Sequence, residues 1–150
     1  MKIILLVLAS VLLDPLIATQ LGSISHFSEI NNQFEFHTSD GAMIRVIFYR
    51  SDIFRIWIGP GGNFTDPAGE EETPIVIYKN NPIKVNKSDK TEYYKLETRS
   101  CVLRIYKNPC MFSLYKKDNT TLLFKETKPI IYGDVSYQSI SKNVNDYISW

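Results

Sequence analysis

Apolar and polar residues alternate along most of the chain from about residue 30 onward. In residues 42–49, Met43, Arg45 and Ile47 fall on one side of an extended backbone, while Ile44 and Val46 fall on the other. This period of two is typical of β-strands, and no window holds a helical period for long. The same pattern predicts strands at residues 33–37, 52–59, 74–78, 93–98, 101–106, 111–115 and 121–125.

The predicted strands are short and separated by turn sequences such as "TSDG", "RSD", "GPGG" and "KKDNTT". Short strands with punctuating turns indicate an antiparallel β-sandwich, here from about residue 30 to 140. The polar stretches "EEETP" and "KNNPIKVNKSDKTE" are expected to be solvated connections. The residues expected in the core are Phe34, Phe36, Ile44, Val46, Phe48, Ile56, Ile58, Leu103, Ile105, Phe112 and Leu114.

The first twenty residues, "MKIILLVLASVLLDPLIATQ", combine one lysine with an apolar run from Ile3 to Leu13. That run is too short to span a bilayer and has the length of a secretory h-region. We therefore expect residues 1–21 to be a signal peptide and residues 22–150 to be one secreted or extracytoplasmic domain. A buried N-terminal strand or helix is the alternative.

Charge excludes one class of partner. The chain carries 17 Lys and Arg against 16 Asp and Glu, which gives a net charge of +1, and the basic residues are scattered. Proteins that bind nucleic acid through phosphates need a basic excess or stripe. We expect no nucleic-acid partner and no stable membrane span.

Two cysteines, Cys101 and Cys110, lie in "CVLRIYKNPCMFSLY", which predicts strand, turn and strand. Cys110 is expected opposite Tyr106, so Cys101 lies five residues, about 17 Å, farther along its strand. A disulfide requires Cα atoms within about 7 Å. Two buried thiols are therefore expected.

Motifs for catalysis, metals and cofactors are missing from the sequence. It contains no G-x-S-x-G, P-loop, H-E-x-x-H or C-x-x-C, and two histidines, His26 and His37, cannot form a three-ligand zinc site. The acidic residues mostly lie in loops beside lysines or in "GEEE", where they are expected to be solvated. We therefore expect no catalytic residue, no metal and no cofactor.

Three Asn-x-Ser/Thr sequons begin at Asn63, Asn86 and Asn119, all in predicted turns that would tolerate glycosylation. Nine Tyr, eight Phe and two Trp are compatible with an aromatic core and, alternatively, with stacking on sugar rings. The core interpretation accounts for most of them.

Specific motifs resemble the N-terminal β-sandwich domain of glycoside hydrolase family 31. "RVIF" at residues 45–48, "DIFRIW" at 52–57 and "PGGNFTDPA" at 60–68 resemble its "R-V-x-F", "D-I-x-R-I/V-W" and "P-x-G-N-F-T-D-P-A". "YYKLETRSCVLRIYKNPCMFSLY" and "NTTLLFKE" resemble its following strands, with Thr121 where glycine is common. The likeness runs from about Gln33 to Tyr147.

The resemblance implies a galactose-mutarotase-like sandwich that precedes a catalytic (β/α)₈ barrel. The family mostly hydrolyses α-glucosidic bonds with retention, using two aspartates of the barrel in motifs such as "W-x-D-M-N-E", which this chain lacks. "NVNDYISW" resembles the approach to the family's "D-E-Y-F-Y-G-G-G" but departs from it after Tyr147. The expected partners are therefore the barrel of the same protein and an α-glucoside or oligosaccharide substrate.

Asp66, the acid within "GNFTDPA", is expected to cap a turn and not to act as a nucleophile. Three alternatives remain open: a free-standing secreted carbohydrate-binding module, the N-terminal domain of an α-glucosyltransferase, and a secreted sandwich that binds a protein.

Overall fold

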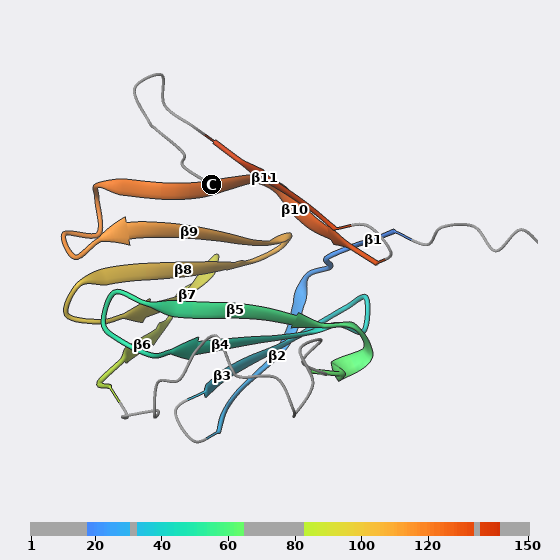
Figure 1. The fold of residues 1–150 in the computed structure, drawn as a ribbon, viewed down its shortest axis with the longest axis horizontal. Coiled ribbons are helices and arrows are strands. Elements are labelled where there is room, and N and C mark those ends of the chain that lie inside the picture. Colours follow the sequence, from blue (N-terminus) through green and yellow to red (C-terminus); the bar gives the residue numbers. More distant parts are fainter. Residues whose placement is uncertain (1–17, 31–32, 65–82, 134–135, 142–150) are drawn as a thin grey trace, which may run out of the picture.

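A computed structural model describes residues 18–30, 33–64, 83–133 and 136–141. Two antiparallel sheets face each other, with β8 to β11 above and β2 to β5 below in Figure 1. The four-stranded sheet has the order β2-β3-β4-β5. Its strands are β2 (Ile24–Ile30), β3 (Gln33–Thr38), β4 (Met43–Phe48) and β5 (Phe54–Gly59).

The seven-stranded sheet has the order β1-β10-β9-β8-β7-β6, and β11 also pairs with β10. Its strands are β1 (Thr19–Gln20), β6 (Asn86–Asp89), β7 (Tyr93–Glu97), β8 (Cys101–Lys107), β9 (Cys110–Lys116), β10 (Leu122–Tyr132) and β11 (Tyr137–Ile140). In the described ranges, a 3-10 turn, η1 (Pro60–Gly62), is the one helical element. No helix there is long and apolar enough to cross a membrane.

The core lies between the two sheets and is filled by the residues that alternation assigned to it. Phe34, Phe36, Ile44, Val46, Phe48, Leu103, Ile105 and Phe112 are all buried in one cluster, against which Ile56, Ile58 and Leu114 pack. The strand register explains this, since Phe36 pairs with Ile44 and Ile44 pairs with Ile58 across β3, β4 and β5. The predicted antiparallel sandwich is confirmed.

Several strands were not predicted. Residues 86–89, expected to lie in a solvated connection, form β6 by pairing with β7. Residues 24–30 form β2, and β10 continues to Tyr132 beyond its predicted end at residue 125. The predicted strand at 74–78 and the "EEETP" connection lie outside the described residues.

The N-terminal boundary of the fold also needs correction. Residues 19–21 were excluded from the domain, but Thr19 and Gln20 pair with Tyr132 and Ile131 of β10. Leu21 is 1% exposed, and its N–H donates to the Ile130 carbonyl at 2.8 Å. Residues 19–21 therefore belong to the sheet, although they were expected to lie before the domain.

Candidate functional site

The sequence motifs that suggested a family meet on the outer face of the four-stranded sheet. Arg45 pairs with Glu35 on β3 and with Trp57 on β5. Its guanidinium makes an ion pair with Glu35 at 2.7 Å and lies 4.0 Å from the centroid of the Phe64 ring. The rings of Phe64 and Trp57 meet edge to face, with a centroid separation of 5.3 Å. Phe64 of "GNF" thus holds the segment after β5 against the "RVIF" and "DIFRIW" strands.

The "GPGG" sequence forms the turn that brings Phe64 back to the sheet. Gly61 and Gly62 have φ values of 58° and 79°, which favour glycine. Gly59 admits no side chain either, because a Cβ there would lie 2.6 Å from the Asn63 carbonyl oxygen. The interpretation of this stretch as a turn is confirmed for residues 59–64.

In the described residues two carboxylates are buried, contrary to the expectation that acidic residues mostly lie in solvated loops. Glu35 is neutralised by Arg45, as described above. Glu126 is 1% exposed and accepts hydrogen bonds from the Phe112 N–H at 2.8 Å and the Gln138 amide at 2.7 Å. The β9–β10 ladder ends at Ser113 and Lys125, so the next N–H along β9, that of Phe112, needs the Glu126 oxygen as its acceptor.

Burial raises the pKa of Glu126, and the hydrogen bonds from Gln138 and Phe112 only partly offset that effect. A raised pKa in a carboxyl group is one property of a general acid. Both oxygens of Glu126, however, are engaged by groups of the sheet itself. The group therefore has a structural role that links β9, β10 and β11.

A retaining glycosidase needs two carboxyl groups about 5–5.5 Å apart in a sugar-sized cleft. Two surface hollows in the described part of the chain contain one carboxylate each, Asp89 and Glu92. Asp89 is held by Lys107 at 2.6 Å. The absence of catalytic residues from this chain stays a prediction, and Asp66 lies outside the described residues.

The histidines are neighbours on β2 and β3, where His26 pairs with His37 and their ring centroids are 5.6 Å apart. His37 lies near the end of β3, as expected. In the described ranges, no group of three or more His, Cys, Asp or Glu residues could hold a metal ion.

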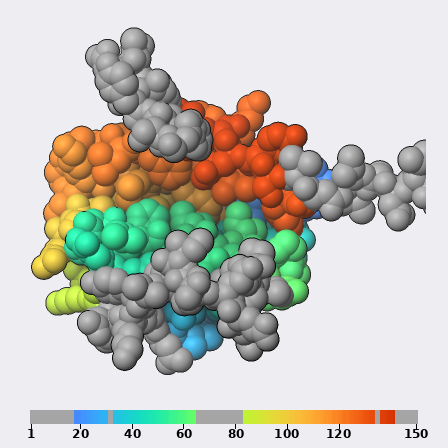
Figure 2. Space-filling model, viewed as in Figure 1, coloured from blue at the N-terminus to red at the C-terminus, as the bar shows by residue number. Residues whose placement is uncertain are grey.

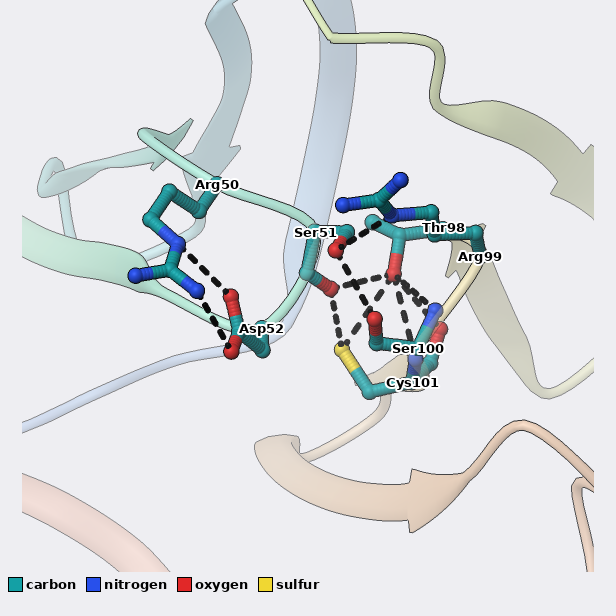
Figure 3. A network of polar contacts seen from close by, with 7 residues as sticks. All are labelled: Arg50, Ser51, Asp52, Thr98, Arg99, Ser100 and Cys101. Carbon is teal, nitrogen blue, oxygen red and sulfur yellow. Dashed lines mark hydrogen bonds and ion pairs between the residues drawn. The ribbon is translucent and has the colours of Figure 1, made fainter.

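A polar network joins the two sheets at one end of the sandwich (Figure 3). The Thr98 hydroxyl, in the turn between β7 and β8, donates to the Ser51 carbonyl at 2.5 Å in the turn between β4 and β5. It also accepts the N–H groups of Ser100 and Cys101, and the Cys101 thiol donates to the same Ser51 carbonyl at 3.4 Å. Ser51, Thr98 and Cys101 therefore act as a cross-link between the sheets.

Both cysteines are free and buried, as predicted. The predicted register was wrong by one residue, because Cys110 pairs with Lys107 and Tyr106 pairs with Met111. The tight turn at Asn108 and Pro109 accounts for the shift, since it takes two residues where "KNP" was expected to take three. Burial, with the nearby charges of Glu126 and Asp40, raises the pKa of the Cys110 thiol far above its usual range.

The sequons differ in their surroundings. Asn63 is exposed after η1, and Asn119 lies in the β9–β10 turn, as predicted, whereas Asn86 lies in β6 and not in a turn. Asn119 has a φ of 59°, and its side-chain oxygen accepts hydrogen bonds from Arg104 at 2.8 and 3.2 Å. Glycosylation at the three positions stays a prediction.

Solved structures share this sandwich. The glycoside hydrolase family 31 (GH31) dextranase of Flavobacterium johnsoniae, complexed with glucose, matches with a TM-score of 0.67 at 21% identity. The chain has the fold of a segment of GH31 dextranase. The match covers 77% of this chain and 14% of the dextranase, and a mutant of that enzyme complexed with isomaltotriose matches with a TM-score of 0.64.

A second similar structure is the cycloalternan-forming enzyme of Listeria monocytogenes in complex with a pentasaccharide substrate. Its TM-score is 0.58 at 17% identity, and the match covers 75% of this chain and 10% of that enzyme. The chain therefore corresponds to a small part of each of these proteins. No protein-family model matches the sequence. No curated protein matches it either.

Proposed function

We propose that this chain is the non-catalytic N-terminal β-sandwich domain of a secreted GH31 glycoside hydrolase, α-glucosidase-like, and that it packs against a catalytic (β/α)₈ barrel. The observation that carries the proposal is the joint likeness of fold and motifs. A TM-score of 0.67 to a GH31 dextranase coincides with the packing of Phe64 on Arg45 and Trp57. That packing joins the segments "RVIF", "DIFRIW" and "PGGNFTDPA", three of those that resemble the family's motifs.

Exposed apolar side chains support a docking role. Four of the six large apolar side chains that are exposed in the described residues, Leu122, Leu123, Tyr137 and Ile140, lie on β10 and β11, and the other two are Ile30 and Ile53. The orange and red region in the upper part of Figure 2 contains β9 as well as β10 and β11. Apolar side chains left exposed on neighbouring strands are candidates for contact with another domain. We assign β10 and β11 to the side that meets the barrel.

Glucosyl transfer is the second activity that the parent protein could have. The dextranase and the cycloalternan-forming enzyme share this sandwich, and their printed names describe different activities. The choice between hydrolysis and transfer would then belong to the barrel. The proposal for this domain is the same in both cases.

An activity assay on two lengths of the protein tests the proposal. The reading frame is extended beyond Trp150, and the longer product and this chain are both assayed against an aryl α-glucoside. The longer product is expected to turn the substrate over, and this chain is expected to be inactive. Turnover by this chain that disappears in Asp66→Asn would place the chemistry here and overturn the proposal, as would a stop codon directly after Trp150.

A further inference from the structure

A surface hollow of about 360 Å³ lies on the seven-stranded sheet, beside the start of β7 and the end of β8. It is lined by Thr91, Glu92, Tyr106, Lys107 and Asn108. Thr91, Glu92 and Asn108 are exposed, and Tyr106 is half-buried at the side of the hollow. The hollow therefore combines one aromatic ring with several side chains that can donate or accept hydrogen bonds.

The aromatic surface continues from the hollow along the outer face of the sheet. Tyr106 pairs with Tyr93 on β7, and their ring centroids are 5.7 Å apart. Arg104 lies two residues before Tyr106 on β8. Its guanidinium is 5.0 Å from the centroid of the Tyr93 ring and 4.0 Å from that of the Tyr115 ring. Since Leu103 and Ile105 point into the core, Arg104 and Tyr106 belong to the outer face. Tyr93 therefore adjoins Tyr106, the aromatic residue of the hollow.

Ser113 on β9 lies on the same face of the sheet. It pairs with Arg104 across β8 and β9, so its side chain belongs to the outer face. Its hydroxyl is buried and lies close enough to the Tyr106 hydroxyl to affect the pKa of that group.

The Tyr106 ring packs against the Tyr93 ring, with the two centroids 5.7 Å apart. Burial alone would raise the pKa of Tyr106, but interactions of its hydroxyl with Ser113, Tyr115 and Arg104 outweigh burial and lower it. A ring that is fixed before binding loses little conformational entropy when a ligand stacks on it.

Charges in the hollow disfavour an anionic ligand. Lys107 is paired with Asp89 at 2.6 Å, which leaves the exposed carboxylate of Glu92 to repel an anion. A polyhydroxyl ligand, whose groups both donate and accept, suits Thr91, Glu92 and Asn108 together.

We propose that this surface, formed by Thr91, Glu92, Tyr93, Tyr106 and Asn108, binds a neutral oligosaccharide. One sugar ring stacks on Tyr106 and fills the hollow, and the next unit lies over Tyr93. This is a binding site without catalysis, and it requires no barrel. It goes beyond the proposed function, and each can fail without the other.

Binding of maltotriose and isomaltotriose to the full 150-residue chain tests the site. Chemical-shift perturbation should be saturable and should centre on residues 91–93 and 106–108 for at least one of the two sugars. Tyr106→Ala should weaken binding about tenfold or more, whereas Tyr106→Phe should retain it, since the ring supplies the stacking surface. Glu92→Gln, on an exposed side chain, should weaken binding without affecting folding.

The matched control is Tyr137→Ala, because Tyr137 is an exposed tyrosine on β11, outside the hollow. It should bind as tightly as the unmodified chain. The proposal is overturned if neither trisaccharide binds, if shifts centre elsewhere, or if Glu92→Gln and Tyr106→Ala bind normally. Binding of trigalacturonate in preference to both neutral sugars would also overturn it. The glucoside assay on the longer product is unaffected by any of these results.

Discussion

The Tyr132 hydroxyl donates a 2.7 Å hydrogen bond to the Asp40 carboxylate, although the two residues are 92 positions apart. The other Asp40 oxygen accepts the Gly22 N–H at 2.9 Å. One carboxylate therefore connects the β3–β4 turn, the segment after β1 and the end of β10. Burial alone would raise the pKa of Asp40, but hydrogen bonds from Thr38, Tyr132 and Gly22 outweigh burial and lower it.

Replacing Tyr132 by Phe removes the hydrogen bond and keeps the ring. We expect the free energy of unfolding at pH 7 to fall by about 2 kcal/mol, the usual value for a hydrogen bond to a charged group. Urea titrations measure this loss. Tyr137→Phe, on an exposed side chain, is the control and should change stability by less than about 0.5 kcal/mol.

The loss in Tyr132→Phe should depend on pH at both extremes. The folded pKa of Asp40 lies below its unfolded value of 3.8, so its stabilisation is present above pH 3.8 and is lost as pH falls through the folded pKa. Burial, with Asp40 nearby, raises the pKa of Tyr132 to about 12 from 10.0, so that contribution is present below pH 10 and is lost as pH rises through 12. A stability difference that stays constant across this range would contradict the assigned bond.

Glu126→Gln is expected to be as stable as the unmodified chain at pH 5 and about 1 kcal/mol more stable at pH 8. The glutamine oxygen can still accept the Phe112 N–H, its NH₂ can donate to the Gln138 oxygen once that amide turns over, and no charge is buried. Because the folded pKa of Glu126 is raised above 4.5, the unmodified chain loses stability as pH rises from 4.5 through that folded pKa. Urea titrations at several pH values measure the effect.

The matched control for Glu126 is Glu92→Gln, which changes an exposed carboxylate. Its stability should follow that of the unmodified chain at every pH. Glu126→Ala leaves the Phe112 N–H without an acceptor and should cost about 2 kcal/mol. Equal pH profiles for Glu126→Gln and the unmodified chain would show that this carboxyl titrates normally.

Thr98→Val tests the cross-link between the sheets. Valine has the shape of threonine but cannot donate to Ser51 or accept from Cys101, so we expect a loss of about 2–3 kcal/mol in unfolding free energy. Thr98→Ser keeps the hydroxyl and should lose less than half as much. If serine and valine cost the same, the threonine methyl and not the network stabilises this end.

The two thiols should be unreactive in the folded protein. Cys110 is fully buried with a raised pKa, and Cys101 is 5% exposed. Since the thiolate is the reactive form, iodoacetamide at pH 8 should label neither residue in the native chain and both in urea. Mass spectrometry counts the labels. Rapid labelling of Cys110 in native buffer would mean that β9 opens at this end.

Phe64→Ala should lower stability by about 2–3 kcal/mol, because the ring packs on both Arg45 and Trp57. Trp57 emission should shift to longer wavelength as its edge becomes solvated. Ile53→Ala, an exposed apolar residue before β5, is the control and should leave both the emission and the stability nearly unchanged. An unshifted spectrum for Phe64→Ala would contradict the contact.

Alternation predicted the core well wherever a strand has one apolar face, as in residues 43–48. It missed β2, "ISHFSEI". The residues of this strand that pack against the core cluster are Ile24 and Phe27, and their spacing of three does not follow a period of two. It also missed β6, "NKSD", because that strand has no apolar residue and exists only through its pairing with β7. Edge strands of this kind are set by neighbours and not by their own pattern.

The site residues show a similar division. The motifs around Arg45 and Trp57 were visible in the sequence, but their contact through Phe64 depends on the path of the "GPGG" turn. On β10, Glu126 lies an even number of residues from Phe124 and Ile130, which pack against the core, so alternation places it on the inward side. A charged residue is nevertheless normally expected in solvent. Its burial follows from where the β9–β10 ladder ends, which no local pattern encodes.

The pairing of β1 with β10 determines when, during synthesis, this part of the sheet can form. Thr19 emerges from the ribosome early, but its partner Tyr132 is made near the end of the domain. At roughly 5–20 residues per second, the N-terminal strand waits on the order of ten seconds for that partner. During this time the Leu21 N–H lacks its acceptor, the Ile130 carbonyl. The first strand can therefore join the sheet only after synthesis has passed β10.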